Sequence, residues 1–175
     1  IFATSSVDTD VCFPDQCGSP YEDVAIRVPP YARKGKVLIP GYRLVATDLY
    51  GKCYFGESGS NCESLAKGDV SDKHVLESIL TSLQGGCSGS QTIDLGANIG
   101  QFTSVLLSMG CTVSAVEPQR PLQNMLISSA VLNGFSDRLT LYRGAVAEKD
   151  GEVIITALWV PGGMQNNPMK KGSML

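Results

Sequence analysis

The chain has 175 residues, of which 43% are hydrophobic and 18% are charged; this composition is typical of one globular domain and excludes a disordered or fibrous chain. Its 14 basic and 17 acidic residues give a formal net charge of −3, which argues against a protein devoted to nucleic acid. No apolar run reaches the roughly 18 residues of a transmembrane helix, and the first residues do not have the pattern of a secretory signal peptide.

The cysteines are the first feature that bears on the compartment. There are six: Cys12, Cys17, Cys53, Cys62, Cys87 and Cys111. An even, clustered set is compatible with disulfides in an oxidising compartment, such as the lumen of the secretory pathway, and equally with free thiols. In an oxidising lumen we expect the first four to pair among themselves and the last two to stay free. The spacing of the cysteines does not favour zinc, and no metal site is predicted.

The chain changes character near residue 70. Residues 1–35 are rich in Pro, Asp and Ser and predict irregular structure. Residues 36–55 combine apolar and aromatic residues with turn-forming pairs, which predicts one or two short hairpins. Residues 56–70 are polar and glycine-rich and predict a loop. Together these segments form an expected N-terminal extension over residues 1–70.

Regular patterns begin at residue 71. Apolar residues recur at helical spacing from Val75 to Leu83, which predicts a helix that begins at Ser71 or Asp72. The only histidine, His74, falls in the first turn of this helix. We expect it to be exposed rather than catalytic.

The following segments alternate between strands and helices. Apolar runs predict strands over residues 92–95, 112–116, 139–142 and 152–156, and helical spacing predicts helices near residues 102–109 and 122–132. This alternation predicts an α/β fold with a parallel sheet in the order third, second, first strand. We expect helices on the faces of the sheet and a ligand outside the carboxyl ends of its strands. Residues 71–160 form the predicted half-domain, and residues 161–175 a loose loop.

The turn after the first of these strands carries the most information. It has the sequence Asp-Leu-Gly-Ala-Asn-Ile-Gly over residues 94–100. Gly96 allows a sharp turn, Asn98 tolerates a positive φ, and Gly100 allows a close approach at the start of the next helix. Exposed N–H groups in such a turn, Ala97 included, would suit an anion.

The charges around the turn narrow the choice of ligand. A dinucleotide-binding turn would have glycine at positions 98 and 101, where this chain has Asn and Gln; a nicotinamide-dependent oxidoreductase is therefore disfavoured. The carboxylate of Asp94 can hold an ammonium group while the helix start faces a carboxylate, and these are the two charges of an amino acid. Glu117, which ends the second strand, can accept hydrogen bonds from ribose hydroxyls. The alternative for Glu117 is a solvated charge at a strand end.

These residues resemble class I S-adenosylmethionine-dependent methyltransferases, and in particular the FkbM-type family, whose members are mostly O-methyltransferases. The family's Asp-x-Gly-Ala-Asn-x-Gly pattern is matched by residues 94–100, its Glu-Pro by Glu117-Pro118, its Leu-Asn-Gly by residues 132–134, and its Ala followed by Asp-Gly-Glu by Ala145 and residues 150–152. The likeness covers roughly residues 72–157 and does not extend to residues 1–60.

The resemblance implies a Rossmann-like fold with an incomplete parallel sheet and S-adenosylmethionine as cofactor. Carried over by position, the cofactor-binding residues would be Asp94 for the methionine amino group, Gly96, Ala97, Asn98 and Gly100 for the methionyl part, Glu117 for the ribose, and Gly144 and Ala145 beside the adenine. The family-like fold often has an acidic residue near the last position, where this chain has Arg143-Gly144. Backbone groups are therefore expected to face the adenine.

The family continues beyond the fourth strand into the part that binds the acceptor, whereas this chain stops at Leu175. We therefore expect a fragment of a longer open reading frame, whose acceptor would be a small molecule or a glycan. No catalytic residue is predicted, because methyl transfer depends largely on positioning donor and acceptor. The oligomeric state is not predicted. The alternative is a non-catalytic or degenerate nucleotide-binding or structural module.

Overall fold

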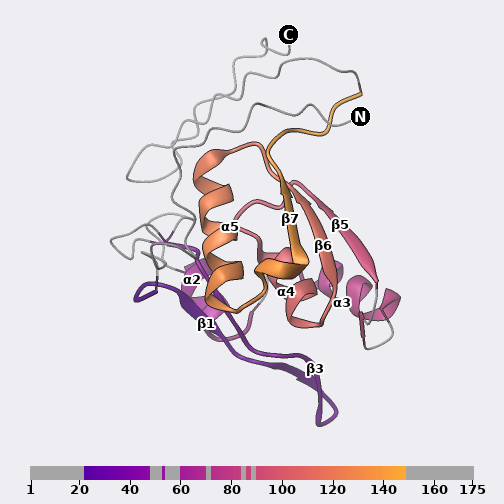
Figure 1. The fold of residues 1–175 in the computed structure, drawn as a ribbon. Helices are drawn as coiled ribbons and strands as arrows, with labels where there is room; N and C mark the ends of the chain where they lie inside the picture. Colours follow the sequence, from indigo (N-terminus) through magenta and orange to yellow (C-terminus); the bar gives the residue numbers. More distant parts are fainter. Residues whose placement is uncertain are drawn as a thin grey trace.

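Three parallel strands form the centre of the computed structural model, which describes residues 22–47, 53, 60–69, 72–83, 86–87 and 90–148 (Figure 1). They are β5 (Gln91–Leu95), β6 (Thr112–Val116) and β7 (Leu139–Tyr142), and they pair in the order β5-β6-β7. The predicted parallel sheet and its strand order are confirmed. The predicted strand over residues 152–156 and the loop over residues 161–175 lie outside the described residues.

The predicted helices are also found. They are α3 (Lys73–Ser82), α4 (Gln101–Ser108) and α5 (Arg120–Leu132), and a short 3₁₀ helix, η1 (Ser136–Arg138), precedes β7. Gly110 and Gly134 follow the ends of α4 and α5 with positive φ, as expected for residues that stop a helix. The apolar spacing therefore predicted the position of these helices, and the glycines predicted where α4 and α5 end.

Among the described residues, helices cover one face of the sheet and not the other. On the covered face, Val113 and Ala115 are fully buried against residues of α4 and α5. On the opposite face, Ile93 is 64% exposed, Leu95 58% and Tyr142 36%. We expected helices on both faces, but the described helices cover only one. The reason is topological: β5, β6 and β7 follow one another in one direction, so successive right-handed crossovers fall on the same side.

The N-terminal part contains more regular structure than predicted. Strand β1 (Ile26–Val28) pairs antiparallel with β4 (Tyr42–Leu44), β2 (Tyr31–Arg33) forms a hairpin with β3 (Lys36–Ile39), and α2 (Ser60–Ala66) follows. Hairpin structure was predicted only from residue 36 onward. The prediction of irregular structure is wrong for residues 26–33, and that of a loop is wrong for residues 60–66; residues 1–21 lie outside the described residues. These strands are too short to show an alternating pattern, and α2 buries few apolar side chains, chiefly Leu65.

Strand β4 joins this part to the helices behind the sheet. Residues 44–46 are fully buried in a core shared with α3, α4 and α5. The side chain of Asn133 accepts a hydrogen bond from the Arg43 N–H (2.8 Å) and donates one to the Arg43 carbonyl (2.7 Å). The hydroxyl of Ser129 accepts a bond from the Val45 N–H (2.8 Å). Polar side chains of α5 and of its C-cap residue therefore satisfy the backbone of β4 on its free edge.

Four cysteines in the described part of the chain form two disulfide bonds. Cys53 is bonded to Cys62, in line with the expected pairing of the N-terminal group, whereas Cys12 and Cys17 lie outside the described residues. Cys87 is bonded to Cys111, with Cα atoms 4.6 Å apart. The expectation that these two stay free is wrong. They precede β5 and β6, and neighbouring parallel strands begin at the same edge of a sheet.

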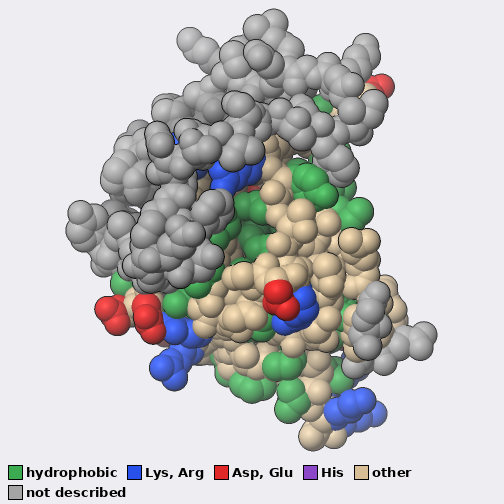
Figure 2. Space-filling view, viewed as in Figure 1, with side chains coloured by type: hydrophobic (Ala, Val, Ile, Leu, Met, Phe, Trp, Pro, Cys, Tyr) green, Lys and Arg blue, Asp and Glu red, His purple; other side chains and the backbone are tan. Residues whose placement is uncertain are grey.

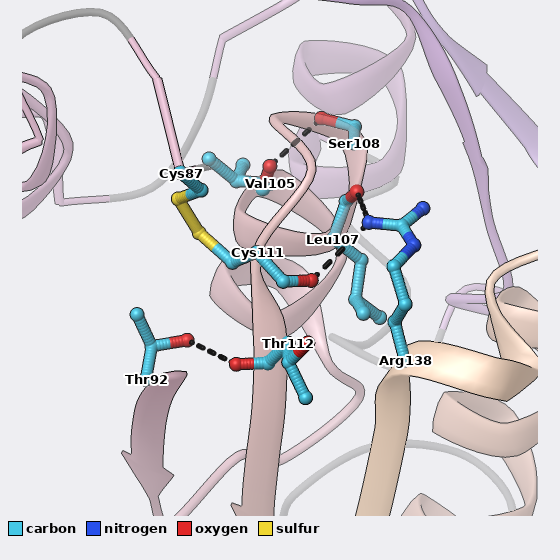
Figure 3. Close-up of a disulfide and its surroundings, with 8 residues drawn as sticks. All are labelled: Cys87, Thr92, Val105, Leu107, Ser108, Cys111, Thr112 and Arg138. Atoms are coloured by element: carbon cyan, nitrogen blue, oxygen red, sulfur yellow. Dashed lines mark hydrogen bonds between the residues drawn. A yellow bond between two sulfur atoms is a disulfide. The ribbon is translucent and has the colours of Figure 1, made fainter. Parts of the chain in front are cut away.

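Hydrogen bonds also stabilise this amino-terminal edge of the sheet (Figure 3). One guanidinium nitrogen of Arg138 donates to the carbonyl of Leu107 (2.6 Å) in the last turn of α4 and to that of Cys111 (3.2 Å) after the helix. The hydroxyl of Thr92 donates to the Thr112 carbonyl (3.2 Å) and links β5 to β6. The disulfide and these bonds lie at the opposite ends of the strands from the predicted ligand site.

Replacing both Cys87 and Cys111 by Ala is expected to lower the free energy of unfolding by about 2–4 kcal/mol, because the cross-link closes a long loop in the unfolded chain. Urea unfolding without reductant measures the effect. The pair Cys53→Ala and Cys62→Ala is the control and should cost less, since the sequence separations are 9 and 24. If the Cys87 and Cys111 thiols alkylate fully in native, unreduced protein, the disulfide assignment is wrong.

Neither the described helices nor the basic side chains on the face shown in Figure 2 form an extended feature typical of a membrane span or a basic patch. Among the described residues, no helix has the length and apolar character needed to cross a membrane. On the face shown in Figure 2, the Lys and Arg side chains are scattered rather than gathered into one patch.

Candidate functional site

The carboxyl ends of the three parallel strands meet at one edge of the sheet. The N–H groups of Gly96 and Ala97, which follow β5, both donate to the Val116 carbonyl at the end of β6 (2.9 and 3.0 Å). The N–H of Glu117 donates to the Tyr142 carbonyl at the end of β7 (3.1 Å). The structure therefore brings together the glycine turn, Glu117 and the segment after β7, as the sequence predicted.

The backbone of the turn has the conformation that its residues favour. Gly96, Asn98 and Gly100 have φ values of +78°, +54° and +83°. A Cβ atom on Gly100 would lie 2.8 Å from Cγ of Leu126, so glycine is what allows α4 to begin against α5. A Cβ atom on Gly96 would meet nothing within 4 Å. Within the described chain, the space in front of Gly96 is therefore open to a ligand.

Glu117 is a buried carboxylate that holds the turn. Only 3% of the residue is exposed. Its Oε2 accepts a hydrogen bond from the Asn98 N–H (2.9 Å), and its Oε1 accepts one from the Gln119 N–H (2.8 Å). The alternative of a solvated strand-end charge is therefore wrong. A carboxylate has about four lone-pair positions, so two remain for hydroxyl groups of a ligand.

Asp94 lies at the other side of the turn, near the end of β5. Its Oδ2 accepts a hydrogen bond from the Thr103 hydroxyl of α4 (2.5 Å). Burial raises the pKa of Asp94 above its ordinary value, and hydrogen bonds from the hydroxyl and N–H of Thr103 partly oppose the shift. Sequence reasoning missed Thr103. The sequence feature that could have identified it is a small polar residue among the apolar positions of α4. The structure shows that Thr103 is almost fully buried.

The backbone N–H groups of the turn are less available than expected. Those of residues 96–100 are all engaged: two bind Val116, and the others bind Glu117, the Asn98 side chain and the Ala97 carbonyl. Those of Gln101 and Phe102, in the first turn of α4, have no hydrogen-bond partner among the described residues, and Gly100 at the N-cap position has no side chain to offer them. An anion would therefore meet the start of α4 rather than the turn itself.

The other residues that the sequence singled out lie partly at this edge and partly away from it. Gly144 and Ala145 are half-buried directly after β7, at the same edge as Glu117. His74 is exposed in the first turn of α3, as expected. Within the described ranges, no group of three or more His, Cys, Asp or Glu residues could hold a metal ion. The site thus offers a carboxylate for a cation, a second carboxylate for hydroxyls, and helix donors for an anion.

The fold and the site together define a mixed α/β protein whose three-stranded parallel sheet presents a glycine turn and two acidic residues at one edge. No family model matches this chain, and the comparisons with curated proteins and solved structures found no match either.

Proposed function

We propose that this chain carries the S-adenosylmethionine-binding part of a class I methyltransferase of the FkbM type. The observation that carries the proposal is the bond between Glu117 Oε2 and the N–H of Asn98, which links the acidic end of β6 to the glycine turn after β5. A ligand lying across both strand ends would meet the turn and the carboxylate together. This is the place where open parallel sheets bind nucleotides.

Each end of S-adenosylmethionine would meet a group of matching chemistry. Asp94 would hold the methionine ammonium group, since a carboxylate on that side of the turn attracts a cation. The open space before Gly96 would take the methionyl chain. The free lone pairs of Glu117 would accept the ribose hydroxyls. Backbone groups at Gly144 and Ala145 would border the adenine.

The acceptor of such an enzyme would be a small molecule or a glycan, bound by residues not assigned in this chain. The part of the catalysis proposed for the described residues is to hold the donor in a fixed position, so that the methyl group can meet its acceptor in line. None of them is assigned as a general base.

One observation favours a second candidate, a degenerate nucleotide-binding or structural module. Both oxygens of Glu117 already accept backbone N–H bonds, as a carboxylate with a purely structural role would do. In that case the turn would keep its shape without any nucleoside. Direct binding measurements separate the two candidates.

Titration with S-adenosylhomocysteine, with NAD as the control nucleotide, tests the proposal, and Asp94→Asn sharpens it. We expect binding of S-adenosylhomocysteine alone, weakened about tenfold or more by Asp94→Asn through loss of the ammonium partner. The affinity of the parent should fall as the pH drops through the Asp94 pKa, which burial places above the usual value. The affinity of Asp94→Asn should stay constant over this window.

Stability provides the matching control. The raised pKa means that the folded state disfavours the charged carboxylate of Asp94. This lowers the free energy of unfolding at pH values above the folded-state pKa, and the loss disappears at pH values below the pKa of the unfolded chain. Asp94→Asn removes this cost and keeps an acceptor for Thr103. Its free energy of unfolding at neutral pH should therefore be no lower than that of the parent. If no nucleoside binds the parent, the methyltransferase proposal is wrong and the structural module is favoured.

A further inference from the structure

The side chain of Asp94 lies on the face of the sheet that the helices cover. Its neighbours Ile93 and Leu95 are exposed on the uncovered face, and side chains alternate along a strand, so Asp94 points toward the helices. A carboxylate in such a place is unfavourable unless hydrogen-bond donors face it. The helix that packs against β5 at this level is α4.

Thr103 of α4 supplies the donors. Its hydroxyl donates to Oδ2 of Asp94 (2.5 Å), its backbone N–H also bonds the Asp94 carboxylate, and only 1% of the residue is exposed. Thr103 is the third residue of α4, and Gly100 at the N-cap position has no side chain to cap the helix. Asp94 therefore acts as the missing cap from the strand before it. Two bonds to one residue fix the orientation of the carboxylate.

Among the described residues, the ionisation of Asp94 depends on burial and on Thr103. The glycine turn, α4 and β6 contain no titratable side chain. Glu117 lies across the turn, where its oxygens accept the N–H groups of Asn98 and Gln119. Burial raises the pKa of Asp94 and the two Thr103 bonds lower it, without a contribution from another charge. Loss of the Thr103 hydroxyl should therefore raise this pKa further.

We propose that Thr103 is a positioning residue, which orients the Asp94 carboxylate and keeps it charged for a cationic group of the ligand. The inference rests on the proposed function and deepens it, because it names the residue that sets the pH range in which the amino end of the ligand is bound. A carboxylate has about four lone-pair positions, and Thr103 takes two of them. The others are left for an ammonium group, which a neutral carboxyl group would bind more weakly.

Two substitutions separate the hydroxyl of Thr103 from its packing. Thr103→Val keeps the shape of the side chain and the backbone N–H, whereas Thr103→Ser keeps the hydroxyl. At neutral pH we expect Thr103→Val to weaken S-adenosylhomocysteine binding by about 3- to 10-fold. Its loss of affinity on acidification should begin at a higher pH than in the parent, and Thr103→Ser should match the parent in both respects. The affinity of Thr103→Val for 5′-methylthioadenosine, which lacks the amino-acid part, should change by less than about threefold.

Two further variants test whether the effect passes through Asp94. In the Asp94→Asn background, Thr103→Val should change the affinity by less than about twofold, because the carboxylate is already absent. Ser108→Ala is the control in the same helix, since it removes a hydroxyl that donates to the Val105 carbonyl (2.8 Å) at the far end of α4. It should leave both the affinity and its pH dependence as they are in the parent.

The ligand-free chain allows a measurement that does not depend on the proposed function. Carbon-13 NMR of the Asp94 carboxyl group should show a higher pKa in Thr103→Val than in the parent, and the parental pKa in Thr103→Ser. An unchanged pKa in Thr103→Val overturns the role of Thr103. The same holds if the parent binds S-adenosylhomocysteine and Thr103→Val binds it with equal affinity and pH dependence, a result that leaves nucleoside binding intact. A parent chain that binds no nucleoside overturns the proposed function, and this inference with it.

Discussion

Replacing Glu117 by Ala is expected to weaken S-adenosylhomocysteine binding by about 30- to 150-fold, which corresponds to roughly 2–3 kcal/mol. In the proposed complex, the change would remove two charge-assisted hydrogen bonds from the ribose hydroxyls to the buried Glu117 carboxylate. It also leaves the N–H groups of Asn98 and Gln119 without their acceptor. The free energy of unfolding should therefore fall as well, by about 1–3 kcal/mol. Isothermal titration and urea unfolding measure the two effects separately.

A ligand variant separates the ribose contact from a distorted turn. The 2′,3′-dideoxy analogue of S-adenosylhomocysteine lacks the hydroxyls that Glu117 would bind. It should bind the parent far more weakly than S-adenosylhomocysteine does, and it should bind Glu117→Ala about as well as S-adenosylhomocysteine does, because the interaction is already lost. If the hydroxyls remain equally important in Glu117→Ala, the ribose is held by another group.

Gly100→Ala is expected to lower the free energy of unfolding by about 2–5 kcal/mol. The added Cβ atom would lie 2.8 Å from Cγ of Leu126, in a well-packed contact between α4 and α5, and overpacking of this kind costs about 1–3 kcal/mol. The φ of +83° adds about 1–2 kcal/mol for any residue with a Cβ atom. Urea unfolding measures the sum.

Gly110→Ala is the matched control, because Gly110 has a φ of +92° and a Cβ atom there meets nothing within 4 Å. It should show only the conformational part of the effect. In the combination of Gly100→Ala with Leu126→Ala, the loss should be smaller than the sum of the single losses, since the second change removes the clashing atoms. Equal losses in Gly100→Ala and Gly110→Ala would show that close packing plays no part.

Much of the sheet could be predicted because the sequence patterns that specify its strands and helices lie within short segments of the chain. The apolar runs of β5, β6 and β7 and the helical spacing of α3, α4 and α5 lie within single segments, and each is bounded by glycine or proline. The positive φ of Asn98 and the role of Gly100 followed from residue types alone. The acidic residues at the ends of β5 and β6 were found because parallel strands end at one edge.

The N-terminal strands could not be predicted, because their partners are distant in the sequence. Ile26 pairs with Leu44, and the backbone of β4 is satisfied by Asn133, 90 residues away from Arg43. Three residues are too few to show a period of two. The pairing of Cys87 with Cys111 was missed for a related reason, since it depends on where two strands begin in space and not on their spacing in the chain.

By itself, then, the sequence determined the order of strands and helices, the shape of the glycine turn and the presence of an acidic residue on either side of it. Only the tertiary structure decided what those acidic residues do before any ligand arrives: Glu117 binds the turn, and Asp94 binds Thr103. It also decided that the side-chain nitrogen of Gln101 is buried without a hydrogen-bond partner among the described residues, while the N–H groups of residues 96–100 are engaged. The reason is physical: backbone conformation depends on neighbouring residues, whereas burial and hydrogen-bond satisfaction depend on which distant groups the fold brings into contact.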